Sequence, residues 1–144
     1  MSGLPVDRVF TLPTAHYPIS ISAIAAFAAA LSGGWSDCLC LPSTDRTESF
    51  GMVLLEAMSA AKACVVSDVE GSGMSWLVED GKTGLVAPTH DINGFTEALC
   101  RLRDDPELAA TLGQNGRQKF LAALTIDASA VGIRNLYHQL SSVR

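Results

Sequence analysis

The sequence lacks a hydrophobic segment long enough to cross a bilayer. Its most apolar stretch, residues 19–31 (ISISAIAAFAAAL), is shorter than the roughly 20 residues that a spanning helix needs. The stretch also lacks the cationic start of a secretory signal, because Asp7 offsets Arg8 ahead of it. We therefore expect an alanine-rich packed helix in this region, with a signal segment as the alternative interpretation.

The sequence also lacks paired cysteines. Its 4 cysteines include no C-x-x-C pair and have no histidine at ligand spacing beside them: Cys38, Cys40, Cys64 and Cys100. This pattern argues against a zinc site and against a disulfide framework. Three of the four lie in apolar runs, where cysteine acts as a small core hydrophobe. We expect reduced thiols and a cytoplasmic location, with peripheral association with the inner membrane as an alternative.

Positive charge is scarce. The chain has 10 Lys and Arg against 15 Asp and Glu, which gives a formal net charge of −5. Such a chain gains no general electrostatic attraction to nucleic acid, so we exclude nucleic acid as a partner. Hydrophobic residues make up 48% of the 144 residues and charged residues 17%. These proportions indicate one folded globular domain rather than a disordered chain.

Short apolar runs alternate with segments rich in helix formers. Three runs suit strands that are buried on both faces: residues 38–41, 63–67 and 85–87. Helices are expected at residues 50–61 and 92–102, with Asp91 as the N-cap of the second. Pro106 opens another helix, and the chain is helical from there almost to its end. This order predicts an α/β fold with a single Rossmann-like parallel sheet flanked by helices and a mostly helical C-terminal third.

Residues 37–58 (DCLCLPSTDRTESFGMVLLEAM) place a polar loop between a predicted strand and a predicted helix. Ligands of parallel α/β sheets bind at the carboxyl ends of the strands. A helix that begins there offers free N–H groups and a positive dipole end, which suit a diphosphate. Gly51 allows the ligand to approach the backbone. Glu48 and Glu56 flank this site, and because carboxylates repel phosphate we expect them to bind hydroxyl groups of a sugar or ribose.

Glu48 and Glu56, with seven residues between them, resemble the E-x7-E motif of the retaining "group 1" glycosyltransferases of GT-B fold. Other elements of that family match in the same order: D-x4-P-S at residues 37–43, E-x-F-G at 48–51, E-A-M at 56–58, V-V-S-D at 65–68 and D-G-x-T-G-L-V-x-P at 80–88. The similarity runs from about Asp37 to Phe120. It implies the C-terminal, donor-binding half of a GT-B fold, which transfers a glycosyl group from a nucleotide-diphosphate sugar with retention. It also implies that no metal or other cofactor takes part.

The resemblance implies roles for individual residues. Glu48 matches the residue that contacts the hydroxyls of the donor sugar, and it is the candidate catalytic residue. Glu56 matches the residue that binds the ribose hydroxyls. The other donor-binding candidates belong to the turn between them or supply charge near it: Arg46, Ser49, Phe50, Gly51, Met52 and Val53.

Other parts of the sequence depart from the family pattern. Residues 1–36 have no firm counterpart and are expected to form an atypical segment, with a possible strand and the alanine-rich helix, ahead of an incomplete donor-binding domain at 37–144. The family's Arg and Lys that neutralise the diphosphate are missing, and the chain has no room for an acceptor-binding half. We therefore expect the lone chain to be inactive and to need an acceptor-domain protein or a homodimer partner. A non-catalytic remnant that binds nucleotide or protein, and an unrelated doubly wound nucleotide-binding domain, remain alternatives.

Overall fold

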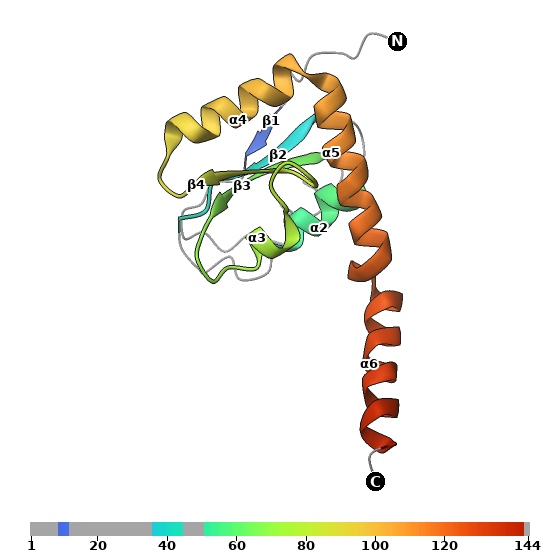
Figure 1. The fold of residues 1–144 in the computed structure, drawn as a ribbon. Helices are drawn as coiled ribbons and strands as arrows, with labels where there is room; N and C mark the ends of the chain where they lie inside the picture. The colour runs from blue at the N-terminus through green and yellow to red at the C-terminus, as the bar shows by residue number, and fades with distance from the viewer. Residues whose placement is uncertain (1–8, 12–35, 45–50, 143–144) are drawn as a thin grey trace, which may run out of the picture.

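The structure is a computed structural model, and it describes residues 9–11, 36–44 and 51–142. The predicted helix at residues 19–31 lies outside these ranges. The described strands form one sheet in the order β1-β2-β3-β4, and each neighbouring pair is parallel (Figure 1). Their bounds are β1 (Val9–Thr11), β2 (Cys38–Leu41), β3 (Ala63–Asp68) and β4 (Leu85–Pro88). The predicted parallel pairing of the three apolar runs is confirmed.

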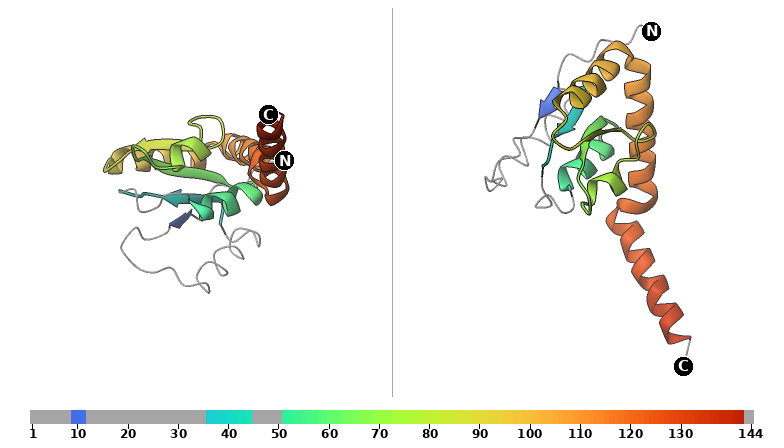
Figure 2. Two further views of the ribbon diagram at one scale, coloured as in Figure 1. Left: turned by 90° about the horizontal axis from the view of Figure 1, so that it is seen from below. Right: turned by 60° about the vertical axis from the view of Figure 1, so that its left-hand side comes forward.

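Helices lie on both faces of the sheet, as the view along its edge shows (Figure 2). Helices α2 (Met52–Ser59) and α3 (Met74–Leu77) pack on one face, and α4 (Ile92–Asp104) and α5 (Pro106–Lys119) pack on the other. Strand β3 supplies both cores, because Cys64 and Val66 point to the first face and Ala63 and Val65 to the second. This explains why the strands are apolar at consecutive positions. The predicted α/β class with a Rossmann-like parallel sheet is confirmed.

Local capping fixes where the helices on the second face begin. The Asp91 side chain accepts a hydrogen bond from the Gly94 N–H at 3.0 Å, as predicted for the N-cap of α4. The Asp105 side chain accepts one from the Leu108 N–H at 2.9 Å, and Pro106 occupies the first turn of α5. Each cap satisfies a backbone donor that would otherwise have no partner within the helix.

The helical C-terminal part is interrupted, which the sequence analysis did not predict. After α5 the chain forms a π-helix, η1 (Phe120–Leu124), and Thr125 is extended (ψ 160°) before α6 (Ile126–Ser141) begins. Helices α4 and α5 cover a face of the sheet, as expected. Helix α6 does not, because it runs away from the body and none of its residues is buried (Figures 1 and 2). Within the part of the chain described, the apolar residues of α6 are therefore uncovered.

The cysteines behave as core residues. All 4 are free thiols, and Cys38, Cys40 and Cys64 are buried. Burial raises the pKa of the Cys38 thiol and of the Cys64 thiol to about 12, so both stay protonated at neutral pH. A buried, protonated thiol is a poor nucleophile and a poor metal ligand, which agrees with a packing role. No helix within the described ranges is long and apolar enough to span a membrane.

Candidate functional site

The start of α2 carries no capping side chain on its N-cap residue. Gly51 precedes the helix in the left-handed region (φ 57°), and its carbonyl accepts a hydrogen bond from the Leu54 N–H at 2.7 Å. Gly51 supplies no capping side chain, and the first turn of α2 carries no acidic residue. No side chain of the described residues caps the N–H groups of Met52 and Val53. Within the first turn of α2 no acidic side chain neutralises the positive end of the helix dipole, which favours an anion there.

Glu56 lies one turn further along α2, and one of its carboxylate oxygens is in an unusual position. Its Oε2 atom is buried and has no hydrogen-bond partner among the residues that the structure describes. Burial raises the pKa of this carboxyl group above its ordinary value. A buried acceptor without a partner costs about 1–3 kcal/mol. A hydroxyl donor placed at this oxygen would remove such a cost.

The structure places only some of the predicted site residues. It brings together Gly51, Met52, Val53 and Glu56 at the start of α2. The Met52 side chain is exposed and the Val53 side chain is buried in the core. The contact that both residues can make with a ligand is therefore through their backbone N–H groups. The other candidates lie outside the described residues: Arg46, Glu48, Ser49 and Phe50. The approach of Glu48 to Glu56 therefore stays a prediction.

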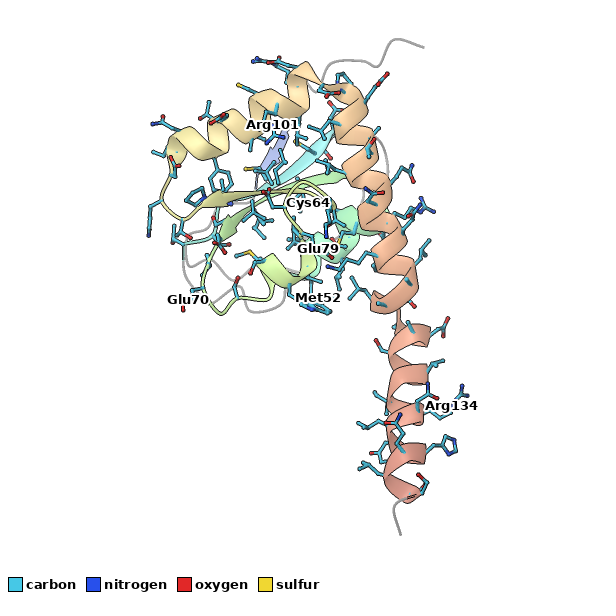
Figure 3. All side chains as sticks on the ribbon, in the orientation of Figure 1. Met52, Cys64, Glu70, Glu79, Arg101 and Arg134 are labelled. Atoms are coloured by element: carbon cyan, nitrogen blue, oxygen red, sulfur yellow. The ribbon has the colours of Figure 1, made fainter. Side chains whose placement is uncertain are left out.

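Cations are missing from the described loops at the carboxyl ends of the strands. Residues 42–44, 69–73 and 89–91 contain no Lys or Arg, and the sequence has none between Arg8 and Arg46. Figure 3 shows Met52 and Glu70 on one side of the molecule and Arg101 on the side of α4. Lys62 stands immediately before β3, and thus at the amino edge of the sheet, away from these loops. Among the described residues at this edge, the N-terminus of α2 offers the positive end of a helix dipole that no acidic side chain of the first turn neutralises.

The first turns of α4 border a cavity of about 400 Å³ that the sequence analysis missed. It lies beside the carboxyl ends of β2 and β3, and most of its wall is apolar, with Cys40, Ser67, Ile92, Phe95 and Leu99 among the lining residues. The spacing of Phe95 and Leu99, which puts both on one face of a helix, was the sequence feature that could have predicted this cavity. Of the predicted donor-site residues that the structure describes, namely Gly51, Met52, Val53 and Glu56, none lines this cavity.

Residues 22–119 match the family of glycosyl transferases group 1. An uncharacterized glycosyltransferase of Methanocaldococcus jannaschii is 35% identical over 104 residues, which are 72% of this chain and 29% of that protein. The chain spans less than a third of the length of the curated relatives it matches.

Two solved structures share the fold. Sucrose-phosphate synthase from Thermosynechococcus elongatus superposes with a TM-score of 0.66 and 32% identity, over 84% of this chain and 28% of that one. The C-terminal domain of a group 1 family protein from Francisella tularensis superposes with a TM-score of 0.61 and 20% identity, over 78% of this chain and 53% of that one. The family match covers most of the chain, and the sheet and its helices agree with it. The chain therefore belongs to the group 1 glycosyltransferases, and its fold is that of their C-terminal domain.

Proposed function

We propose that this domain binds the nucleotide-diphosphate sugar donor of a retaining glycosyl transfer. The observation that carries the proposal is the buried Oε2 atom of Glu56, which has no hydrogen-bond partner among the described residues and lies one helical turn from the uncapped start of α2. The two groups differ in what they attract. The helix end favours a diphosphate, and the carboxylate favours a hydroxyl. A nucleoside diphosphate carries both in one molecule, because the ribose that bears the hydroxyls is esterified to the diphosphate.

The proposed arrangement assigns one part of the donor to each group. The diphosphate lies against the N–H groups of Met52 and Val53, and Gly51 supplies the left-handed turn (φ 57°) that leads into them. The ribose hydroxyls donate hydrogen bonds to Glu56. The family resemblance places the sugar hydroxyls on Glu48 and implies retention of configuration, and both remain part of the proposal. The acceptor would be supplied by a second protein domain or a second chain.

Replacing Glu56 with Gln tests this arrangement by titration with nucleotide-sugars in a calorimeter. A hydrogen bond to a charged group contributes about 1.5–3 kcal/mol, so we expect Glu56→Gln to weaken donor binding about tenfold or more. Glu97→Gln is the matched control, since Glu97 is an exposed carboxylate on α4. Equal affinities of the wild-type chain and the Glu56 variant for every donor tested would remove the support for the proposal.

The same substitution should increase stability while it decreases affinity. Burial raises the pKa of Glu56 in the folded state, so the folded chain binds the proton more tightly than the unfolded chain. The free energy of unfolding of the wild type should therefore fall as the pH rises from the unfolded pKa through the raised folded pKa. Gln cannot ionise, so Glu56→Gln should lack this loss and unfold at a higher temperature at pH 7. A variant that loses both stability and affinity would indicate general disruption of the helix instead.

A further inference from the structure

Strand β4 forms one outer edge of the described sheet, with β3 as its neighbour on the inner side. A strand in this position presents backbone N–H and C=O groups that can pair with a strand of another molecule. The segment that contains β4, residues 80–88, carries the D-G-x-T-G-L-V-x-P element, to which donor binding assigns no role. The backbone groups on the outer side of this segment decide whether the edge can pair.

The N–H of Val86 points away from β3, because it donates a hydrogen bond to Oδ1 of the Asp80 side chain at 2.9 Å. The backbone groups of a strand alternate between its two sides with a period of two residues. Gly84 and Pro88, two residues before and two residues after Val86, therefore also direct their backbone groups outward. These three residues set the hydrogen-bonding character of the outer edge.

Backbone groups of the same chain already use most of this edge. The Gly84 carbonyl accepts a hydrogen bond from the Gly81 N–H at 2.8 Å, and the Pro88 carbonyl accepts one from the Asp91 N–H at 3.1 Å. Pro88 itself has no N–H to offer. The Val86 N–H is therefore the donor that a pairing strand would need at the centre of the edge, and one side chain decides whether it is available.

The turn that carries the Asp80 side chain is held from two sides. Thr83 is buried, and its hydroxyl oxygen accepts a hydrogen bond from the Glu79 N–H at 2.9 Å. The Asn115 side chain on α5 donates a hydrogen bond to the Lys82 carbonyl at 2.9 Å. The carboxylate of Asp80 is therefore positioned at the edge by the fold of the turn.

We propose that Asp80 blocks the outer edge of β4 and so keeps it from pairing with a strand of another molecule. Hydrogen bonds to a charged acceptor are about twice as strong as those to the neutral carbonyl of an incoming strand. The bond joins residues of one chain, so it forms at every protein concentration, whereas pairing between molecules grows with concentration. An incoming strand would also meet the exposed negative charge of Asp80. The inference is independent of donor binding, because residues 80–88 include none of the proposed donor residues.

Amide hydrogen exchange of Val86 in the 144-residue chain tests whether Asp80 holds this N–H. The wild type should protect the amide although it lies on an edge strand, and Asp80→Ala should let it exchange at least about tenfold faster, as loss of a hydrogen bond to a charged group implies. Asp80→Asn keeps an acceptor oxygen at the same place and should retain most of the protection. A wild-type Val86 amide that exchanges like an exposed amide would overturn the proposal, whether or not the Ala variant folds. Equal exchange in the wild type and a folded Ala variant would overturn it as well.

Sedimentation velocity over a range of concentrations tests the consequence for pairing. We expect Asp80→Ala to associate at a concentration at least about tenfold lower than the wild type. Glu70→Ala is the matched control, since it removes one exposed carboxylate from the loop after β3 and should behave like the wild type. In the associated Ala variant, protection of the Val86 amide should return, because a carbonyl of the second strand takes the place of Asp80. Unchanged association of the Ala variant, or association that leaves the Val86 amide unprotected, would contradict the role proposed for Asp80.

Discussion

The 144-residue chain, incubated alone with nucleotide-sugars and a broad panel of acceptors, will form no glycosylated product. Holding an acceptor at attack distance supplies about 7–11 kcal/mol in well-oriented reactions. This chain matches less than a third of the length of each of these curated relatives. Most of the surface on which a relative could hold an acceptor is therefore missing from this chain. Negative charge also develops on the departing diphosphate, and the described loops around the site contain no Lys or Arg.

The N-terminus of α2 is too weak a positive group to replace a pair of cations. A helix N-terminus contributes about 0.3–2 kcal/mol toward a nearby anion. Slow hydrolysis of the donor is the most that we expect from it, with Arg46 as the only sequence-adjacent cation. Mass spectrometry of nucleotide release and of the acceptor panel measures both reactions at once. Robust turnover to product would show that the chain, or a dimer of it, supplies the acceptor site and charge compensation that we assign to other parts.

Replacing Gly113 with Ala should destabilise the fold by about 3 kcal/mol, at the upper end of the cost of overpacking. Gly113 lies where α5 passes the turn between α2 and β3. A Cβ atom on Gly113 would overlap the carbonyl oxygen of Ala61 and would lie 2.8 Å from its carbonyl carbon. Both atoms are backbone, and Ala61 itself already has a left-handed φ of 56°. The turn therefore cannot move aside as a flexible side chain could.

Gly132→Ala is the matched control for that substitution. Gly132 lies within α6, where an added Cβ atom meets nothing within 4 Å. Because Ala is the better helix former, we expect this variant to unfold at the same or a slightly higher denaturant concentration, by up to about 1 kcal/mol. Urea unfolding of the two variants measures the difference. If Gly113→Ala were as stable as Gly132→Ala, the close packing of α5 on the α2–β3 turn would be contradicted.

The sheet could be predicted because each strand carries its own signal. Cys38–Leu41 is apolar at every position, and its bounds were predicted to the residue, while β3 and β4 each extend one residue beyond the prediction. Apolar residues at consecutive positions mean that both faces are covered, and this points to parallel strands between helices. The start of α4 could also be predicted from the sequence, because the Asp91 cap is a local interaction.

Other features depend on interactions that a sequence pattern does not encode. No Gly or Pro marks the break at Thr125, so a continuous helix was expected there. The apolar periodicity of α6 predicts a helix but does not reveal that the domain leaves it uncovered. The spacing of Glu48 and Glu56 suggested the donor site, yet only the packing around α2 shows that one oxygen of Glu56 is buried with no partner among the described residues. The placement of Glu48 itself stays a prediction.

The most direct test of donor binding at α2 is a map of amide chemical-shift changes in the 144-residue chain on addition of uridine, guanosine and adenosine diphosphates in turn. The proposal predicts that at least one of them causes saturable changes concentrated at Gly51, Met52, Val53 and Glu56. It also predicts that Lys82 and Asn115, which are joined by a hydrogen bond at the amino edge of the sheet, do not respond. Saturable changes confined to that edge, or to the cavity wall at Phe95 and Leu99, would contradict the site proposed here.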